Sequence, residues 1–396
     1  MLRKCYLLFA IFATIAVLPS CATKVECGAE QLDEYLPLLE GKRVALLSNH
    51  TGVIGNTHVL DVLLANGVNV VAVFSPEHGF RGTASAGEHV SSSIDEKTGI
   101  PILSLYSGGN NQPSDEDMQK FDILICDIQD VGLRYYTYYI TMVKMMAVLS
   151  DFGKPMIVFD RPNPNGYYVD GPILDMKYKS GVGYLPIPVV HGMTMGELAT
   201  MANGEGWLPN GKHCELTVIR CRNYTHSTFY DLPVMPSPNL GNMLAVYLYP
   251  SMCYFEGTPV SLGRGTDKPF LQYGHPNYAN DSILPHGGVA TLFTPIACPQ
   301  ALKPPQEGVL CKGVDLSNLT IDKATKIGLD LSFLIDAYHH TECEKFFTPF
   351  FEKLIGVGYV REMIEEGYTA EEIRACWQDD VKKFKKQRKP YLLYEE

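Results

Sequence analysis

Short apolar runs alternate with stretches of helical periodicity along the first part of the chain, from about Gly41 onward. This rhythm is typical of βαβ units. The predicted strands are residues 43–48, 70–74, 101–105, 122–126 and 156–159. The predicted helices between them include residues 57–65 and 141–150. Because the strands are apolar almost throughout, we expect a parallel sheet that is covered on both faces.

The fold class predicted for this part is therefore α/β, with an open, doubly wound and mainly parallel sheet. No G-x-G-x-x-G or G-x-x-x-x-G-K-[ST] motif follows the first strand, so neither a dinucleotide nor a nucleotide phosphate is the expected ligand. With 396 residues, the chain exceeds what one hydrophobic core usually supports. The rhythm ends near Leu174 in a Pro- and Gly-rich region, where we expect a second domain to begin.

Two capping boxes mark helices in this second part. Thr194 with Glu197 predicts a helix over residues 193–203, and Thr369 with Glu372 predicts the start of a final helix. The final helix carries apolar residues at helical spacing, which places Trp377 in the core. These residues are Ile373, Cys376, Trp377, Val381 and Phe384. The basic run 382–389 is expected to be a solvated helix face near the C-terminus, where cations are favoured.

Polar and ionisable residues follow each predicted strand. They occupy residues 49–52, 76–78, 106–109, 127–130 and 160–163. Because ligands bind at the carboxyl ends of the strands in open parallel sheets, we expect these residues to line a crevice. Three later segments rich in turn-forming residues, 236–239, 255–258 and 263–267, are expected to add a rim to it. The alternative is that their side chains only cap their own turns.

Composition and charge narrow the class of protein. Apolar residues make up 46% of the chain and charged residues 19%, which fits an ordered globular protein. The formal net charge of -11 argues against a nucleic-acid partner.

Residues 1–20 have the pattern of a signal peptide. Arg3 and Lys4 precede an apolar segment, residues 6–18, that is too short to span a membrane comfortably. Leu18-Pro19-Ser20-Cys21 follows and resembles a bacterial lipoprotein cleavage box. We expect Cys21 to carry a lipid that tethers the protein in the cell envelope, periplasmic or associated with the outer membrane, with residues 21–40 as tether and N-terminal segment. Ordinary signal-peptidase cleavage nearby is the alternative.

The cysteines do not form a recognisable framework. Of eleven cysteines, nine remain when Cys5 and Cys21 are set aside. An odd number without a C-x-x-C pair excludes a regular disulfide scaffold and a zinc ribbon. Cys298 and Cys311 flank a Pro-rich loop and could bridge, whereas Cys126 is expected to be a small buried hydrophobe.

Among the side chains that can take part in catalysis, carboxylates are the most frequent at the strand ends. No G-x-S-x-G or H-E-x-x-H motif is present. The scattered histidines leave a metal site as a weaker alternative; they are His50, His78, His89 and His191. Acid-catalysed cleavage of a glycosidic bond needs two carboxyl groups, one of them protonated. Glu77 is the first candidate for the proton donor, and the candidates for its partner are Asp130, Asp160, Asp170 and Glu256.

Aromatic residues and arginines favour a sugar as the ligand. Four tyrosines crowd behind Asp130: Tyr135, Tyr136, Tyr138 and Tyr139. Arginine binds carboxylates bidentately, so several candidates are compatible with an acidic sugar. They are Arg81, Arg134, Arg161 and Arg264. The residues alone therefore support a small-molecule crevice enzyme, with hydrolysis as one possible reaction.

Several long motifs resemble the exo-β-N-acetylmuramidases, a family long known only as a domain of unknown function. They are residues 75–82 (SPEHGFRG), 129–138 (QDVGLRYYTY), 160–164 (DRPNP), 191–198 (HGMTMGEL), 256–258 (EGT) and 263–266 (GRGT). The resemblance extends from about Gly41 to Tyr394 and keeps the motifs in order.

This resemblance implies a Rossmann-like catalytic domain without a dinucleotide, over residues 41–174. It also implies a smaller C-terminal α/β domain, residues 175–396, that completes an active-site cleft. The implied reaction is release of N-acetylmuramic acid from the non-reducing end of peptidoglycan fragments. No cofactor or metal is implied, and the partners expected are the saccharide substrate and a membrane reached through the N-terminal lipid.

The site residues predicted from the strand ends, the rim loops and the resemblance fall into two groups. The catalytic candidates are Glu77, Asp130 and Glu256. The substrate-binding candidates are Asn49, His78, Arg81, Gln129, Arg134, Tyr135, Asp160, Arg161, Asn163, Asn239 and Arg264. The chain departs from the family pattern at Leu262 and Asp170, where glutamate is expected, which argues against a direct role for either position.

Two other functions remain open on the sequence. One is a lipid-anchored protein that binds muropeptides without cleaving them. The other is a metal-dependent amidase or esterase that acts on the same polymer. The sequence does not decide between retention and inversion, which depends on the separation of the carboxyl groups, nor does it give the oligomeric state.

Overall fold

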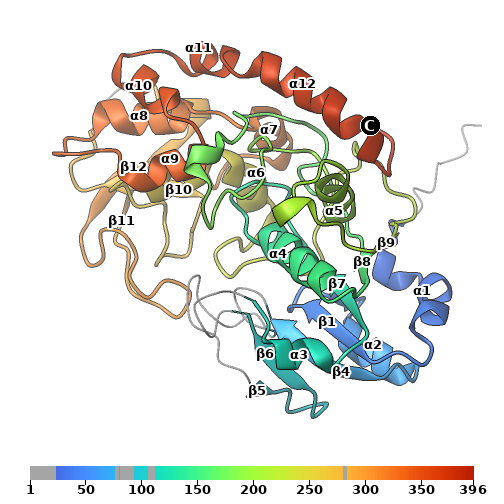
Figure 1. The fold of residues 1–396 in the computed structure, drawn as a ribbon. Helices are drawn as coiled ribbons and strands as arrows, with labels where there is room; N and C mark the ends of the chain where they lie inside the picture. Colours follow the sequence, from blue (N-terminus) through green and yellow to red (C-terminus); the bar gives the residue numbers. More distant parts are fainter. Residues whose placement is uncertain (1–23, 76–79, 81–92, 106–111, 280–282) are drawn as a thin grey trace, which may run out of the picture.

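A seven-stranded sheet forms one half of the molecule in the computed structural model, which describes residues 24–75, 80, 93–105, 112–279 and 283–396 (Figure 1). The order across it is β5 (Ser93–Ile94), β6 (Pro101–Ser104), β4 (Val70–Ser75), β1 (Val44–Ser48), β7 (Ile123–Asp127), β8 (Met156–Phe159) and β9 (Leu216–Ile219). All neighbours pair in parallel except β5, which runs antiparallel to β6. The predicted mainly parallel sheet is confirmed.

The sheet is covered on both faces, because successive residues of each strand enter different cores. In β1, Ala45 and Leu47 join the larger core with the helices α3 (Asp115–Gln119), α4 (Tyr138–Asp151) and α5 (Met195–Gly204). Val44 and Leu46 join the smaller core with α1 (Leu32–Leu39) and α2 (Val59–Ala65). The doubly wound arrangement predicted from uniformly apolar strands is therefore confirmed.

Most element boundaries differ from the prediction by one to three residues, and two of the differences change the description of the fold. The helix expected from residue 57 begins at Val59, because residues Thr57–His58 form β3, which pairs with β2 (Val53–Ile54). The ring Nδ1 of His58 then accepts a hydrogen bond from the Leu60 amide and caps α2. Strand β9 lies beyond residue 174, so the sheet continues past the point where the sequence predicted the second domain to begin.

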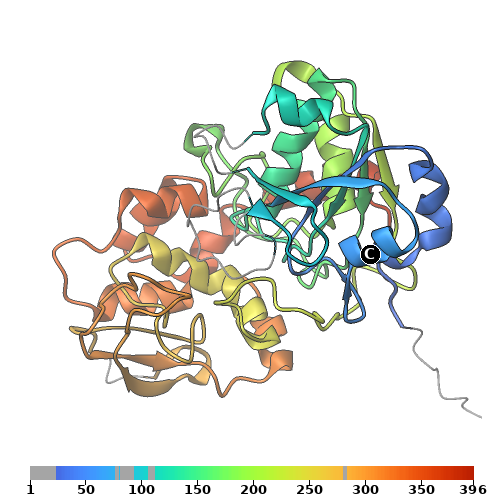
Figure 2. The same cartoon turned by 90° about the horizontal axis from the view of Figure 1, so that it is seen from below.

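The other half combines a small antiparallel sheet with helices, and the two halves lie side by side (Figure 2). The sheet has the order β10 (Gln272–His275), β12 (Cys311–Asp315) and β11 (Val289–Phe293). The helices are α6 (Met243–Met252), α7 (Ile321–Ile327), α8 (Ser332–His340), α9 (Pro349–Ile355) and α10 (Tyr359–Glu365). Short 3-10 helices complete the chain at Gly28–Glu30 (η1), Met176–Tyr178 (η2), Pro209–Gly211 (η3), Cys253–Gly257 (η4), Pro285–Gly287 (η5) and Lys389–Tyr391 (η6). The predicted smaller α/β part is confirmed.

The predicted final helix is in fact two helices. Both predicted capping boxes are present, and Thr369 opens α11 (Ala370–Ala375). The chain then breaks at Trp377, which precedes α12 (Gln378–Arg388). The indole Nε1 of Trp377 donates to Asp170 Oδ1 at 2.8 Å, and the ring is buried, as predicted. This interior hydrogen bond, which the periodicity cannot reveal, accompanies the break.

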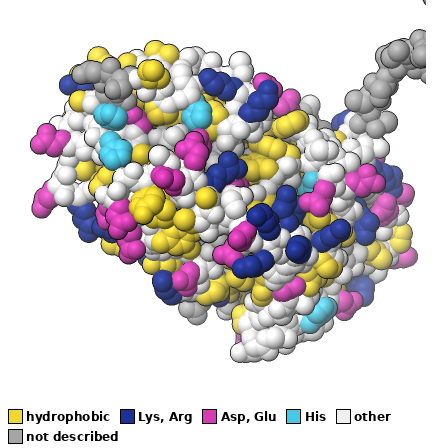
Figure 3. Space-filling view, turned by 90° about the horizontal axis from the view of Figure 1, so that it is seen from above, with side chains coloured by type: hydrophobic (Ala, Val, Ile, Leu, Met, Phe, Trp, Pro, Cys, Tyr) yellow, Lys and Arg dark blue, Asp and Glu magenta, His cyan; other side chains and the backbone are white. Residues whose placement is uncertain are grey.

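Helix α12 crosses the molecule above both halves, and basic side chains gather on the face seen in Figure 3. The side chains of Lys382 and Lys383 are 71% and 78% exposed and pair with Asp379 and Asp380. The predicted solvated helix face is therefore confirmed. None of the helices in the described chain has the length and apolar character needed to cross a membrane.

Arg134 joins the two halves from the inside. Its side chain is fully buried, and its guanidinium donates to four main-chain carbonyl groups. Nη1 donates to Pro172 O at 2.6 Å and Ile187 O at 3.0 Å, and Nη2 donates to Leu354 O at 2.9 Å and Ile355 O at 2.7 Å. Burial lowers the pKa of this guanidinium. The predicted role in gripping a substrate carboxylate is not supported, because these donors are occupied by the fold.

We expect Arg134→Met to lower the free energy of unfolding by about 4 kcal/mol, because it leaves buried carbonyl oxygens without donors. The measurement is urea unfolding followed by circular dichroism. Arg43→Met is the matched control, since Arg43 pairs with Asp122 at the exposed surface and its loss should leave the unfolding midpoint nearly unchanged. Equal midpoints for the two variants would contradict a structural role for Arg134.

Candidate active site

The polar residues that follow β8 are mostly occupied in holding the fold. Arg161 pairs with Asp127, with Nε to Oδ1 at 2.6 Å and Nη2 to Oδ2 at 3.0 Å, and both side chains are buried. Asp160 Oδ1 accepts a hydrogen bond from the Gly196 amide at 2.9 Å, and Oδ2 accepts one from the Thr194 hydroxyl at 2.7 Å. Burial raises the pKa of Asp160 to about 6. The contacts of Asp160 fix the start of α5. Both Asp160 and Arg161 therefore bond to other parts of the protein and do not face an open cavity.

The amide side chains at the strand ends are also buried and bonded to the backbone. Asn49 Oδ1 accepts hydrogen bonds from the amide and hydroxyl of Thr51, at 3.0 and 2.6 Å. Gln129 Nε2 donates to the carbonyl oxygen of Pro162 at 2.7 Å, and Asn163 Nδ2 donates to that of Met193 at 2.9 Å. These three residues shape the loops at the strand ends, and nothing in their contacts shows that they touch a ligand.

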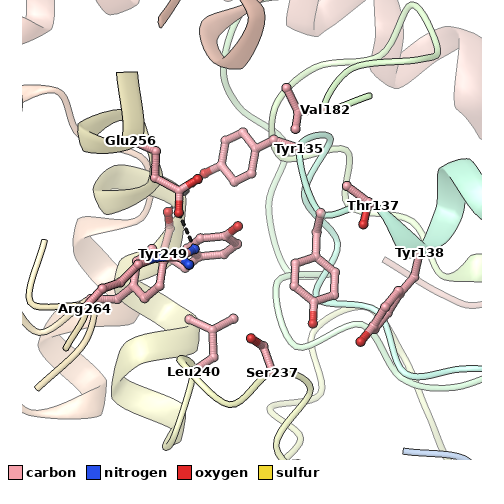
Figure 4. A pocket seen from close by; sticks show the side chains of 11 residues that line it. Tyr135, Thr137, Tyr138, Val182, Ser237, Leu240, Tyr249, Glu256 and Arg264 are labelled. Carbon is pink, nitrogen blue, oxygen red and sulfur yellow. Dashed lines mark hydrogen bonds and ion pairs between the residues drawn. The ribbon is translucent and has the colours of Figure 1, made fainter. Parts of the chain in front are cut away.

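A pocket lies between the two halves, and three of the predicted site residues line it: Tyr135, Glu256 and Arg264 (Figure 4). Its wall is largely aromatic. The full lining is Tyr135, Tyr136, Thr137, Tyr138, Val182, Ser237, Leu240, Tyr249, Glu256, Arg264 and Phe270. The tyrosines at 135–136 precede α4, Tyr249 comes from α6 and Glu256 from η4, so the first half and the second half both contribute.

Glu256 and Arg264 form the charged pair of this pocket. Arg264 Nη2 donates to Glu256 Oε1 at 2.5 Å, and the two side chains remain 23% and 24% exposed. The guanidinium carbon of Arg264 lies 5.3 Å from the centre of the Phe270 ring, close enough for a cation–π contact. The carboxylate and the ring therefore hold the guanidinium at the pocket wall, where it can meet an anion.

The size of the pocket limits what it can accept. The cavity bounded by the described residues measures about 100 Å³. This volume lies below the ~300 Å³ at which sites begin to enclose a whole small molecule. The pocket therefore suits one arm of a ligand rather than a complete sugar.

Asp130 is buried behind this wall. Its Oδ1 accepts a hydrogen bond from the Gly132 amide at 2.8 Å, while its buried Oδ2 accepts none within the described part of the chain. Burial raises the pKa of Asp130 to about 7. The charge of Asp130 in turn helps to raise the pKa of Tyr136, a pocket residue whose pKa is raised mainly by burial. Asp130 is therefore a carboxyl group that exchanges a proton near neutral pH.

Four predicted site residues lie outside the described residues: Glu77, His78, Arg81 and Cys21. Their roles stay predictions. Glu77 is the second residue after Ser75, which ends β4, the strand that pairs with β1.

Asn239 lies beside the pocket but is bonded elsewhere. Its Nδ2 donates to the carbonyl oxygen of Gln300 at 2.9 Å, and its neighbours Ser237 and Leu240 line the cavity.

Asp170, one of the predicted alternatives for the second carboxylate, is buried and pairs with Arg374 at 2.6 Å. Through Arg374 and Trp377, Asp170 therefore holds the end of α11 and the start of α12.

The histidines and cysteines that the structure describes are not gathered into a cluster at the site. Among the residues that the structure describes, no group of three or more His, Cys, Asp and Glu side chains is placed to hold a metal ion. His89, one of the candidate ligands, is not among those residues. Cys298 and Cys311 are both free thiols, so the bridge considered between them is absent here, and Cys126 is buried as predicted.

Sequence reasoning missed Leu240, Tyr249 and Phe270 as pocket residues, whereas Ser237 lies in the predicted rim segment 236–239. Tyr249 stands inside an apolar helix, α6, and therefore looks like an ordinary core residue. Its ring meets those of Tyr135 and Phe270 at centroid distances of 5.3 and 4.9 Å. The only signal for such residues was the concentration of aromatic side chains beside polar loops.

Fold and pocket together define an α/β protein with a pocket between two unequal parts and a paired arginine at the pocket wall. Comparison with known proteins identifies the family. Residues 44–244 match the N-terminal model of exo-β-N-acetylmuramidase NamZ, and residues 247–394 match its C-terminal model. The chain belongs to the NamZ exo-β-N-acetylmuramidase family, and the predicted enzyme class, a glycoside hydrolase, is confirmed.

Individual relatives agree with this. The peptidoglycan β-N-acetylmuramidase NamZ of Bacillus subtilis (strain 168) is 40% identical over 394 residues, which covers 94% of this chain and 92% of the relative. Two crystal structures of DUF1343 family proteins from Bacteroides fragilis NCTC 9343 are similar in fold. One is 58% identical with a TM-score of 0.87 and covers 94% of this chain and 100% of its own. The other is 28% identical with a TM-score of 0.79 and covers 94% and 99%.

Asp130 should make the stability of the folded protein depend on pH. Its folded-state pKa of about 7 lies above the ~3.9 of an unfolded chain, so the folded state binds the proton more tightly. The stabilisation is complete below the lower value and is lost as the pH rises through the higher one. We expect this group to lower the free energy of unfolding by on the order of 3 kcal/mol between pH 5 and pH 8.

The measurement is urea unfolding of the wild type and of Asp130→Asn at several pH values. The asparagine side chain does not titrate, so the variant should lack this part of the pH dependence. Parallel curves for the two proteins across this range would show that Asp130 does not carry the shift.

Proposed function

We propose that the pocket at Glu256 and Arg264 binds the lactyl carboxylate of a terminal N-acetylmuramic acid, and that the enzyme releases this sugar from the non-reducing end of peptidoglycan fragments. The observation that carries the proposal is the guanidinium of Arg264, held at the wall of a small aromatic pocket between the two halves. Exo-action follows if the pocket receives the end of the saccharide, because a chain that continued would not fit.

Arg264 has the donors that a carboxylate needs. A guanidinium carries five N–H donors in a planar fork. One Nη2 donor goes to Glu256, and Nε is buried with no hydrogen-bond partner among the described residues. The remaining donors suit an anion that approaches from the cavity. Glu256 keeps the guanidinium in this orientation through its hydrogen bond to Nη2.

The aromatic walls suit the apolar part of the lactyl arm and the edge of the sugar that carries it. Tyrosine rings offer an apolar face to the sugar and a hydroxyl at the edge. The hydroxyl of Tyr135 donates to the carbonyl oxygens of Tyr249 and Pro250 at 3.0 and 2.9 Å, and that of Tyr136 donates to Pro236 at 2.8 Å. These bonds fix the rings in place, so the proposed ligand meets a rigid surface.

Glu77 is the proposed proton donor to the glycosidic oxygen. It follows β4, and the loops after parallel strands meet at the edge of the sheet where the ligand crevice is expected. It also stands in the family motif at residues 75–82. Asp130 is the proposed second carboxyl group, because its pKa of about 7 allows proton exchange at neutral pH.

Substituting Glu77 tests the proposed chemistry. Glu77→Gln keeps the size of the side chain but removes the acid, so we expect release of N-acetylmuramic acid from a MurNAc-GlcNAc disaccharide to fall by ~10²–10⁴-fold. Product is measured by chromatography, with and without a chelator. A variant as active as the wild type would eliminate Glu77 as the acid, and loss of wild-type activity with chelator would favour a metal-dependent enzyme.

The anion site is tested by substrate discrimination. We expect Arg264→Met to lower kcat/KM for the MurNAc substrate by ~10–100-fold, the loss typical of hydrogen bonds to a charged group. The same change should have little effect on the slow cleavage of a GlcNAc-terminated analogue, which lacks the lactyl group. Arg43→Met serves as the matched control and should leave both rates unchanged. Equal losses on both substrates would mean that Arg264 supports the pocket without binding the lactyl group.

We further propose that the protein is exported and anchored through a lipid on Cys21, in the cell envelope. The support is the sequence of residues 1–21, with its basic start, apolar segment and cleavage box. We expect the wild type to incorporate labelled palmitate and to fractionate with membranes, and Cys21→Ser to do neither. Equal labelling of the two proteins would remove Cys21 as the lipid attachment site.

A further inference from the structure

The segment that follows the proposed tether is docked against the end of β9. Glu26 and Arg222 exchange both main-chain hydrogen bonds, with N to O distances of 3.1 and 2.8 Å, and form an antiparallel bridge. The pair is therefore a hydrogen-bonded pair of an antiparallel ladder. The next position along such a ladder is a non-hydrogen-bonded pair, in which the two residues face each other directly.

Cys27 and Cys221 occupy that next position. In an antiparallel ladder, the residue after Glu26 lies opposite the residue before Arg222. The Cα atoms of such a pair are about 4.5 Å apart, and side chains lie on the same face. This spacing falls within the range of ~4.4–6.8 Å found for disulfides. The Cys221 thiol donates to the carbonyl oxygen of Asp160 at 3.2 Å, the same oxygen that accepts the Gly28 amide, so Cys221 and the segment that begins with Cys27 meet at one point.

The docking is tight enough to keep the two cysteines in this register. The Gly28 amide donates to the carbonyl oxygen of Asp160 at 2.8 Å, and the Cys27 amide donates to Glu30 Oε2 at 2.7 Å. A Cβ atom on Gly28 would lie 2.2 Å from the carbonyl oxygen of Ile219, so this position requires glycine for close approach. Cys27 and Cys221 are 3% and 7% exposed, which protects the pair from other thiols.

In the docked segment, charged and polar groups surround the Cys27 sulfur. The interaction with Cys221, together with the charge of Arg161, lowers the pKa of the Cys27 thiol despite its burial. Arg161 Nη1 lies 4.0 Å from Cys27 Sγ, and the hydroxyl of Tyr230 lies 3.7 Å from it. Burial raises the pKa of the Cys221 thiol.

We propose that Cys27 and Cys221 form a disulfide when the protein meets a thiol oxidant of the disulfide class. This inference goes beyond the glycosidase activity and does not depend on it. The disulfide would join the segment before η1 covalently to the segment after β9, the last strand of the main sheet. Among the nine free cysteines that the structure describes, we assign this role to these two because they face each other across a ladder.

The reaction balances with oxidised glutathione, or an oxidised dithiol protein, as the oxidant. The Cys27 thiolate attacks one sulfur of the oxidant, a mixed disulfide forms and the first thiolate leaves. Cys221 then loses its proton and attacks the Cys27 sulfur, which releases the second thiolate. Two protein thiols lose two electrons and two protons, and one disulfide of the oxidant is reduced to two thiols. Since both cysteines are buried, the first attack takes place while the N-terminal segment is undocked.

The role of the bridge follows from its position. It would close a loop that contains the whole of the main sheet, because Cys27 precedes β1 and Cys221 follows β9. Disulfides that close long loops constrain the unfolded chain most strongly. A mechanical force on residues before Cys27 would then be carried to the main sheet by a covalent bond as well as by the two hydrogen bonds of Glu26.

The test is a redox titration of the full-length protein. The reduced, folded protein is equilibrated with equal concentrations of reduced and oxidised glutathione, the remaining thiols are blocked with N-ethylmaleimide, and peptides are mapped by mass spectrometry without reduction. We expect a peptide pair that joins Cys27 to Cys221. Free, alkylated Cys27 and Cys221 under these conditions would overturn the proposal, as would a bridge from either residue to another cysteine.

Thermal unfolding supplies a second measurement. We expect the oxidised wild type to have a Tm higher than the reduced form by on the order of 5 °C. Cys27→Ala should abolish this redox-dependent difference, whatever its own Tm. Cys214→Ala is the matched control, since Cys214 is a buried free cysteine whose thiol donates to the carbonyl oxygen of Glu215 at 3.6 Å, and it should keep the difference. A difference that persists in Cys27→Ala would count against the bridge.

These outcomes are separate from those for the proposed function. The glutathione titration uses purified protein and gives the same answer wherever the protein resides in the cell. Failure of export is detected by palmitate labelling, and failure of the glycosidase assignment is detected by the disaccharide assay. Only the peptide map and the redox-dependent Tm bear on Cys27 and Cys221.

Discussion

The buried guanidinium of Arg134 is the interaction on which the arrangement of the two halves depends. It reaches carbonyl groups in the loop after Asp170 and at the end of α9, segments that are as many as 221 residues away in sequence. The fit is close, since a Cβ on Gly356 would lie 2.5 Å from Nη2. A delocalised cation that meets carbonyl oxygens from two sides fixes both segments at once. The pocket walls, which come from both halves, take their positions from this contact.

Polar residues at the strand ends serve mainly to build the site rather than to touch its ligand. Asp160, Arg161 and Asn163 are buried and fully engaged with helix starts and loops. Their work is to hold the backbone at the edge of the sheet, which then presents Tyr135 and Tyr136 to the cavity. A family motif can therefore be long and specific without each of its residues binding substrate.

The strands and the general place of the site could be predicted, because apolar runs and the polar loops after them are local in sequence. The roles of individual residues could not. Arg134 and Arg264 look alike in the sequence, yet one is bonded to main-chain carbonyls and the other faces a cavity. Tyr249 sits in an apolar helix, and the pairing of Cys27 with Cys221 depends on a docked segment. Such roles depend on contacts between distant residues, which no local pattern encodes.

The last residues of the chain return to the first sheet. The Tyr394 hydroxyl donates to Asp160 at 2.6 Å, the Leu393 amide donates to Glu197 at 2.8 Å, and the Glu395 carbonyl oxygen accepts from the His226 amide at 2.8 Å. Residues 393–395 are synthesised after the whole of the second half, so the first half gains these contacts only when the second half has also been made. The two halves are therefore interlocked along the chain, and neither is a segment that could be separated without cutting into the packing of the other.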